Sequence, residues 1–273
     1  MIGTDLALAV GILRSGGLVG MPTETVYGLA ADALNVDAVA RIFSAKGRPT
    51  FDPLIVHLWD VSELSRVVCR VPEVALRLAS TCWPGPLTLV LPKAECVPDL
   101  VTAGLPGVGV RVPAHPMARR LLRESGCVLA APSANPFGGI SPTTAEHVVA
   151  GLGDRVDYVL DGGPSRVGVE STVVSLMGDV PVLLRPGGVS LERLRELLGH
   201  VEVARPDTSR DDAAQPAPGM LSRHYAPRTP LRLISTTAVA EPCPGQRTGL
   251  LTWGPESEIP GFDRIFRLCR EGN

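Results

Sequence analysis

The chain has 273 residues, of which 45% are hydrophobic and 20% charged, and its formal net charge is −2 at pH 7. This composition supports a sizeable core and excludes wholesale disorder, and the charge excludes a polycation that coats nucleic acid by bulk attraction. No apolar run reaches the roughly 18 residues that a membrane span needs, and the N-terminus lacks the pattern of a signal peptide. We therefore expect a cytoplasmic protein without a membrane segment.

Cysteine and lysine usage adds two observations. The cysteines lack the close spacing of a metal knuckle, which favours reduced thiols over the alternatives of a zinc site or disulfides. Lys46 and Lys93 are the only lysines among the 26 basic residues. A lysine in a chain that otherwise uses arginine is a candidate functional residue, because a compact ammonium makes contacts that a planar guanidinium cannot.

Apolar periodicity and turn residues predict alternating helices and strands up to about residue 200. In chain order we expect a helix at 4–13, a strand at 18–21, a helix at 35–46, a strand at 54–58, a helix around 74–78, strands at 87–91 and 109–112, a helix at 117–124, a strand at 128–131, a helix at 143–150, strands at 156–160, 172–176 and 182–184, and a helix at 190–198. Such interleaving is typical of one α/β domain around a twisted mixed sheet flanked by helices.

The composition changes after His200. Residues 201–229 are rich in Pro, Asp, Ala and Arg, which favours a linker. Strand-like pieces return at 231–235 and 248–254, but about 45 residues are few for an independent domain. We expect a domain at 1–200, a linker at 201–229, and at 230–273 a small partial α/β segment, the apparently truncated beginning of a C-terminal domain.

Common nucleotide and hydrolase signatures are missing from the chain. No G-x-x-x-x-G-K-[ST] or G-x-G-x-x-G motif occurs, and G-x-S-x-G and H-E-x-x-H are also absent. Four cations nevertheless stand at turns or strand ends, where a charge is costly unless it is paired or faces a ligand. They are Lys46, Arg48, Arg111 and Arg185, and we consider that they converge on one anionic ligand such as a polyphosphate.

Small polar side chains follow the expected strands in the same way. Hydroxyl, amide and imidazole groups there suit hydrogen bonds to a nucleotide or an anion. For each, a helix cap, a turn or a satisfied structural side chain is the alternative interpretation. These residues are Thr23 and Thr25 in the loop PTETVYGL, His57, Ser133, Asn135 and Ser141 around LAAPSANPFGGISP, and Ser171 in GVESTVV.

Several segments, in this order, resemble the YrdC-like family of threonylcarbamoyl-AMP synthases. They are PTETVYGLA, KGRPTFDPLIVH, PGPLTLVL, VGVRVPAHP, APSAN, SPTTAEHV, GVESTVV and RPGG, and they cover nearly all of residues 5–200. PGMLSRHYAP at 218–227 resembles the linker of the long form, which carries a further C-terminal domain. Asp52 departs from the pattern, since many relatives have Asn there.

The resemblance implies an enzyme that joins L-threonine, bicarbonate and ATP into threonylcarbamoyl-adenylate and pyrophosphate, with Mg²⁺ on the phosphates. The product would serve the tRNA threonylcarbamoyl transferase machinery that modifies adenosine next to the anticodon. The linker would act as a lid. By resemblance, Lys46, Arg48, Ser133 and Asn135 form the catalytic set; Arg48, Asp52, Ser133, Ser141, Arg185 and Tyr225 hold ATP; and Thr25, His57, Arg111 and Ser171 hold threonine.

Two alternatives remain open at this point. The same domain occurs in carbamoyltransferases that use carbamoyl phosphate, although those enzymes lack the linker. A non-enzymatic RNA-binding protein is the other, because the concave basic face of the fold permits weak RNA binding. The net charge of −2 and the 4% aromatic content count against it.

Overall fold

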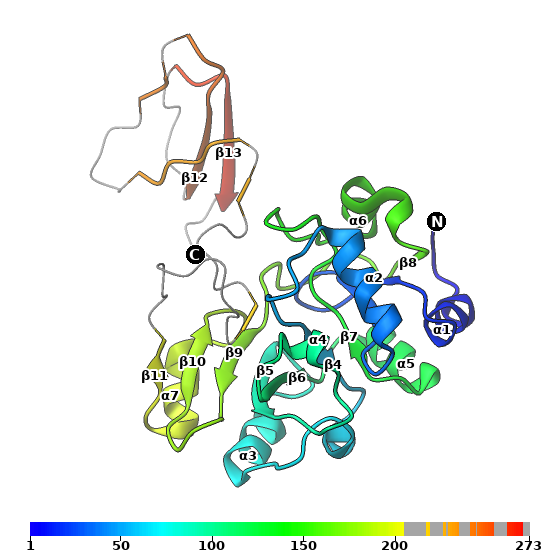
Figure 1. Ribbon diagram of the computed structural model, residues 1–273. Coiled ribbons are helices and arrows are strands. Elements are labelled where there is room, and N and C mark those ends of the chain that lie inside the picture. The colour runs from blue at the N-terminus through cyan, green and yellow to red at the C-terminus, as the bar shows by residue number, and fades with distance from the viewer. Residues whose placement is uncertain are drawn as a thin grey trace. The chain divides into compact units, whose positions relative to one another are not determined.

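The computed structural model describes residues 1–204, 217–218, 226–227, 229–234, 241–243, 245–253 and 261–269. The chain divides into two compact units, Met1–Ala226 and Pro227–Asn273 (Figure 1). Among the described residues, no helix combines the length and apolarity that a bilayer crossing requires. The described cysteine side chains, from Cys69 to Cys243, are free thiols.

The first unit is built on one mixed sheet of eleven strands. Parallel and antiparallel neighbours alternate irregularly, since β4 runs parallel to β6 whereas β5 runs antiparallel to it. In spatial order the strands are β1 (Ile2–Gly3), β8 (Tyr158–Leu160), β2 (Val19–Met21), β3 (Gly28–Asp32), β7 (Leu129–Ala130), β4 (Ile55–His57), β6 (Gly107–Arg111), β5 (Leu87–Pro92), β9 (Thr172–Ser175), β10 (Val182–Arg185) and β11 (Glu202–Val203).

Helices cover this sheet, and their ends follow the capping residues of the sequence. Asp5 caps the first helix and Ser190 the last, each through its side chain, and Gly47 ends α2 in the left-handed conformation. The helices are α1 (Leu6–Arg14), α2 (Val36–Lys46), α3 (Glu73–Cys82), α4 (Asp99–Thr102), α5 (Pro116–Ser125), α6 (Ala145–Leu152) and α7 (Leu191–Leu198), with 3-10 turns η1 (Val61–Arg66) and η2 (Gly153–Arg155).

Both faces of the sheet are buried, and successive strand residues point to opposite sides. In β3, Leu29 and Ala31 belong to the core cluster that includes side chains of α2, α3 and α6. Ala30 between them belongs to the cluster with α1 and α5. Figure 1 shows these two helices lying side by side. The rigid layers fix the strand ends, and with them the side chains that follow the strands.

The expected fold class, a mixed sheet flanked by helices, is confirmed. The sequence did not predict β1, β3, α4 or β11, which are short or built of small residues such as GLAAD. In the second unit, β12 (Gly249–Trp253) pairs in parallel with β13 (Arg264–Cys269). The strand expected at 231–235 is wrong over its described residues. Leu231 and Leu233 are 72% and 97% exposed there, so no neighbouring strand buries them.

Candidate active site

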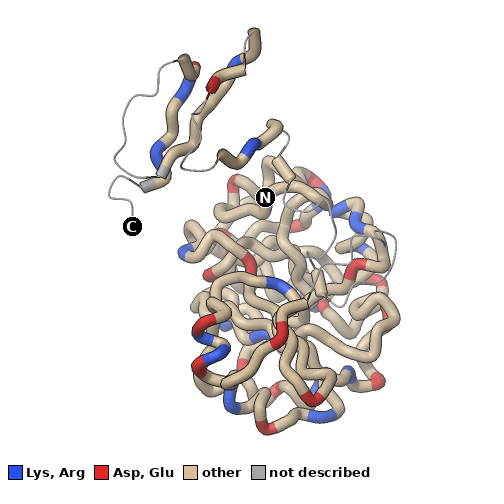
Figure 2. The backbone as a smooth tube through the Cα atoms, turned by 90° about the vertical axis from the view of Figure 1, so that its left-hand side faces the viewer, with Lys and Arg blue, Asp and Glu red and all other residues tan. Residues whose placement is uncertain are grey.

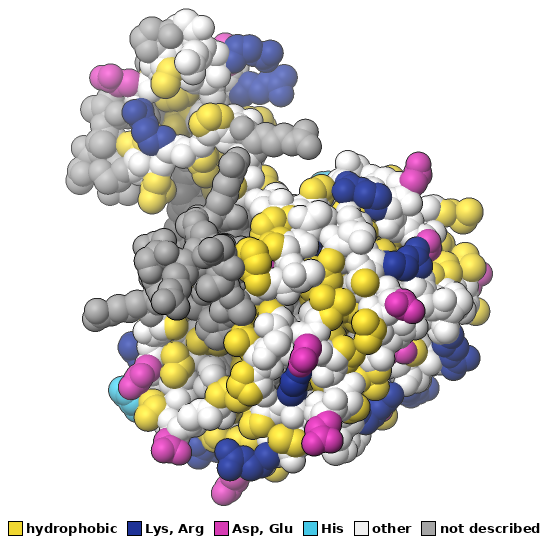
Figure 3. All heavy atoms as spheres, in the orientation of Figure 1, with side chains coloured by type: hydrophobic (Ala, Val, Ile, Leu, Met, Phe, Trp, Pro, Cys, Tyr) yellow, Lys and Arg dark blue, Asp and Glu magenta, His cyan; other side chains and the backbone are white. Residues whose placement is uncertain are grey.

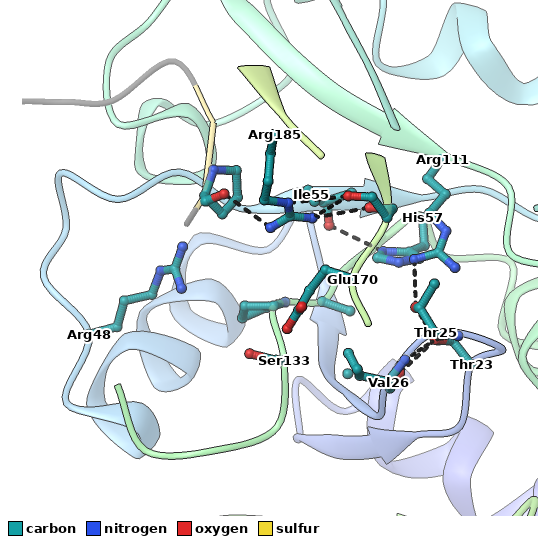
Figure 4. A pocket seen from close by; sticks show the side chains of 15 residues that line it. Thr23, Thr25, Val26, Arg48, Ile55, His57, Arg111, Ser133, Glu170 and Arg185 are labelled. Atoms are coloured by element: carbon teal, nitrogen blue, oxygen red, sulfur yellow. Dashed lines mark hydrogen bonds between the residues drawn. The ribbon is translucent and has the colours of Figure 1, made fainter. Parts of the chain in front are cut away.

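A cleft opens at the ends of several strands, and side chains from distant parts of the chain line it (Figure 4). It is an open cleft, and about 500 Å³ of empty space lies within it when open solvent is included. Most of the residues that the sequence singled out line this cleft. They are Thr23, Thr25, Arg48, His57, Arg111, Ser133, Ser171 and Arg185.

Arg48 reaches the cleft from the turn that ends α2. Its Nε donates to the carbonyl of Asp52 over 3.1 Å and its Nη2 to that of Pro53 over 2.7 Å. Nη2 also lies 2.9 Å from the Asp52 carboxylate, and both side chains are buried. Burial raises the pKa of Asp52, and the Arg48 charge opposes that shift. The buried ion pair with Asp52 thus holds the Arg48 side chain in place.

Arg111 ends β6 directly opposite His57, the last residue of β4. Its Nη2 pairs with Oε1 of Glu24, its Nη1 donates to Oγ1 of Thr25 over 3.0 Å, and its Nε donates to the carbonyl of Gly85. Burial lowers the pKa of Arg111, and the neighbouring Glu24 counteracts this. The guanidinium is therefore held in one orientation before any ligand arrives.

Arg185 lies where β10 ends and joins the linker to the cleft. Its Nη2 donates to the carbonyl and the hydroxyl of Ser171, over 2.9 and 3.2 Å, and its Nη1 donates to the carbonyl of Pro218 over 3.0 Å. Ser171 also shares a 2.8 Å hydrogen bond with Thr88. Ala217 is buried beside Val90 and Val173. Pro218 of the expected linker thus lines the cleft.

His57 is buried, and one ring nitrogen lies 3.2 Å from the carbonyl of Ile55. Burial and the nearby Arg111 lower the pKa of His57 to about 3, so the ring is neutral at neutral pH. Thr23 and Thr25 share a 2.8 Å hydrogen bond between their hydroxyls. This half of the cleft offers neutral hydrogen-bonding groups around one cation.

Lys46 and Asn135 support the cleft wall rather than lining it. The ammonium of Lys46 donates to the carbonyls of Ser133 and Asn135, and burial lowers its pKa well below the usual range. The amide of Asn135 donates to the carbonyls of Pro136 and Gly139, over 2.8 and 2.9 Å. Together these side chains fix the loop that presents Ser133.

The hydroxyl of Ser141 donates to Oε1 of Glu170, which itself lines the cleft. Neither Glu170 nor Glu24 is among the site residues expected from the sequence. Their signals were positional, since each carboxylate adjoins a hydroxyl residue that was identified, Ser171 or Thr25. Tyr225 lies outside the described residues, whereas its neighbour Ala226 donates from its backbone to the carbonyl of Gly138 over 3.0 Å.

These features define an α/β protein with three arginines in a cleft where its strands end. A family model described as telomere recombination matches residues 11–187, and one described as the C-terminal domain of threonylcarbamoyl-AMP synthase matches residues 189–262. The threonylcarbamoyl-AMP synthase of Bacillus subtilis is 46% identical over 96% of this chain and 78% of that protein. The one from Pyrococcus abyssi is 48% identical over 81% of this chain and 65% of that protein.

A solved structure gives the same result. The crystal structure of P. abyssi Sua5 complexed with L-threonine matches this chain with a TM-score of 0.85 and 38% sequence identity. The match covers 98% of this chain and 83% of the P. abyssi chain. The chain belongs to the threonylcarbamoyl-AMP synthase family. The resemblance of its motifs and the expectation of an enzyme of the nucleotidyltransferase type are thereby confirmed.

Proposed function

We propose that this chain makes threonylcarbamoyl-AMP and pyrophosphate from L-threonine, bicarbonate and ATP. The observation that carries the proposal is the convergence of Arg48, Arg111 and Arg185 on one cleft. It is supported by the names of the relatives and by the L-threonine that the P. abyssi structure contains. The product would supply the enzymes that form threonylcarbamoyladenosine in tRNA, a role that places the chain in the cytoplasm.

The residue types fit this chemistry. Threonine amine and bicarbonate give a carbamate, an anion that must attack the α-phosphate of a second anion. No enzyme nucleophile is required; the protein has to hold two mutually repelling anions in line and to stabilise the charge that develops. Three arginines from separate strands and turns provide that field, and hydroxyl groups between them orient the ligands.

The cleft has two halves that suit the two substrates. We assign threonine to the half formed by Thr25, His57, Arg111 and Ser171, with Arg111 facing its carboxylate. We assign ATP to Arg48, Ser133, Ser141 and Arg185, with Asp52 holding Arg48 in place. Lys46 and Asn135 act through the loop that carries Ser133, because their polar groups are bonded to that loop.

Mg²⁺ would enter this site with the phosphates of ATP. Within the described residues, no group of three or more His, Cys, Asp or Glu side chains could hold a metal ion. Mg²⁺ keeps most of its waters and commonly binds through substrate phosphates and one or two carboxylates. The cleft therefore fits a metal ion carried by its substrate, which would neutralise phosphate charge.

We also propose that residues 201–229 include a lid over the nucleotide. Pro218 and Ala226 flank a stretch that lies outside the described residues, and their backbones bond to Arg185 and Gly138 respectively. An adenylate is a reactive mixed anhydride, so a segment that excludes water would protect it. Tyr225 is the candidate for contact with ATP, and Tyr225→Ala should weaken ATP binding without abolishing the reaction.

The alternatives predict different substrates. A carbamoyltransferase would use carbamoyl phosphate, and an RNA-binding protein would turn over neither compound. Figure 2 shows acidic and basic positions interspersed along the backbone of the first unit, and Figure 3 shows mixed charges on one face, which does not suit an RNA-binding surface.

The test is pyrophosphate release with ATP, threonine and bicarbonate, each omitted in turn, and with carbamoyl phosphate replacing bicarbonate. We expect release only with the complete mixture. Equal release without threonine would contradict the proposal.

A further inference from the structure

Glu170 is the one acidic side chain among the described residues that line the cleft. It directly precedes Ser171, and its backbone carbonyl accepts a hydrogen bond from the N–H of Gly188 over 3.0 Å. Its side chain accepts a hydrogen bond from the hydroxyl of Ser141. Both anchors fix the carboxylate at the cleft, so its presence there among three arginines requires an explanation.

The position of this carboxylate lies between the two halves of the cleft. In the view of Figure 4 its side chain lies between Arg48 on one side and Thr25, His57 and Arg111 on the other, with its oxygens turned toward Ser133. The described ion pairs join Arg48 to Asp52 and Arg111 to Glu24, and none of them includes Glu170. Glu170 is therefore available to a ligand at the junction where the two substrates must meet.

The proposed reaction needs a carboxylate at that junction. Threonine arrives as an ammonium ion, which has no lone pair and cannot attack carbon. The arginines suit its carboxylate and the phosphates, but they repel its ammonium group. The nitrogen must also face ATP, because the carbamate formed on it attacks the α-phosphate. A group that binds the ammonium and takes its proton belongs between the two subsites.

We propose that Glu170 binds the ammonium group of threonine and accepts one of its protons, as a catalytic residue of the reaction proposed above. The N–H bond breaks, and its electron pair stays on nitrogen. The free amine attacks the carbon of bicarbonate and a C–N bond forms. A C–O bond of bicarbonate breaks, and the leaving hydroxide takes the second proton from nitrogen as water, so that RNH₂ and HCO₃⁻ give RNHCOO⁻ and H₂O. Protonated Glu170 then releases its proton to solvent.

The other ionisable groups at the cleft suit this role less well. His57 is buried in the half of the cleft assigned to threonine, and one of its ring nitrogens already lies 3.2 Å from the carbonyl of Ile55. Glu24 is already paired with Arg111, and Asp52 with Arg48. Arg48, Arg111 and Arg185 are the charged groups that face the cleft with Glu170.

The test compares Glu170→Gln with the unchanged protein in both directions of the reaction. Forward synthesis from threonine and bicarbonate should fall about 100-fold, on the scale of losing a general base. The defect should shrink as the pH rises from about 7 to about 9.5, because solution then supplies more of the free amine of threonine. Formation of ATP from threonylcarbamoyl-AMP and pyrophosphate moves no amine proton and should change by less than about threefold.

Each outcome discriminates. Retained reverse activity shows that the Glu170→Gln variant is folded. Glu196→Gln is the matched control, because Glu196 forms an exposed ion pair with Arg193 on α7. This control variant should behave like the parent. Equal loss in both directions, or a raised Mg²⁺ requirement, would assign Glu170 to the phosphates and overturn the inference. A pH-independent defect, or an unchanged forward rate, would overturn it too. If the parent protein, without any substitution, is inactive in both the forward and the reverse reaction, the proposed function is refuted instead.

Discussion

Glu24 and Arg111 form an ion pair in which each side chain is only 5% exposed, and it joins the loop after β2 to the end of β6. The second oxygen of Glu24 accepts the backbone N–H of Ala114 over 3.0 Å. Three nitrogens of Arg111 are thereby used, and two of its five N–H donors stay available to a ligand. The pair thus holds the Arg111 guanidinium in one orientation.

Glu24→Ala should lower the free energy of unfolding by about 3–5 kcal/mol, because it leaves a buried guanidinium without its counter-ion. Denaturant unfolding of the purified variant measures this. Glu24→Gln keeps an acceptor for the N–H of Ala114 and should lose less stability than Glu24→Ala. A loss below about 1 kcal/mol for Glu24→Ala, as for an exposed pair, would show that the pair does not stabilise the fold.

Substitutions of Arg111 and Arg48 should affect the KM of different substrates, because the two residues lie in different halves of the cleft. Arg111→Ala is expected to raise the KM for threonine about tenfold or more while changing the KM for ATP little. Arg48→Ala should show the opposite preference. Steady-state kinetics with each substrate varied at saturating levels of the others measures both effects. The reverse pattern would place Arg111 on the nucleotide.

Lys46→Ala should reduce kcat by about 100-fold, the scale of losing one group that preorganises a charged site. The reason is the loop between Ser133 and Asn135, whose carbonyls both accept from the Lys46 ammonium. Lys46→Arg should restore little of this rate, because a planar guanidinium does not fit a site built for a compact ammonium. Lys93→Ala, which removes a partly exposed lysine paired with Asp99, is the control. Normal kinetics in Lys46→Ala would make the contact merely structural.

His57 should make folding stability depend on pH between about 6.5 and about 3. Its pKa is about 3 in the folded protein and about 6.5 in an unfolded chain. In that window the unfolded state binds a proton that the folded state does not, so stability falls as pH falls, by about 1.4 kcal/mol per pH unit. The unfolding free energy is measured at several pH values for the parent and for His57→Gln. The difference between the two proteins at each pH isolates the contribution of His57. A difference independent of pH would contradict it.

The sequence predicted most helices because their ends are local features, such as Asp5, Ser190 and Gly47. It also placed Arg48, Arg111 and Arg185 at turns or strand ends, where position alone suggests a ligand. The sequence did not predict which residues the site side chains contact, because these partners are far apart in the chain. Glu24 lies 87 residues from Arg111, and Ser141 lies 29 residues from Glu170. Only the strand order of the sheet brings such pairs together. The supporting role of Lys46 was hidden for the same reason.

The central claim is that one cleft joins the nitrogen of threonine, the carbon of bicarbonate and the phosphoryl group of AMP. Mass spectrometry of the nucleotide product, formed with ¹⁵N-threonine, ¹³C-bicarbonate and unlabelled ATP, tests it most directly. The account predicts an adenylate that carries both labels, one from each substrate, together with an equal amount of pyrophosphate. Pyrophosphate released with AMP that carries neither label, or with a labelled adenylate that lacks the ¹³C, would contradict it.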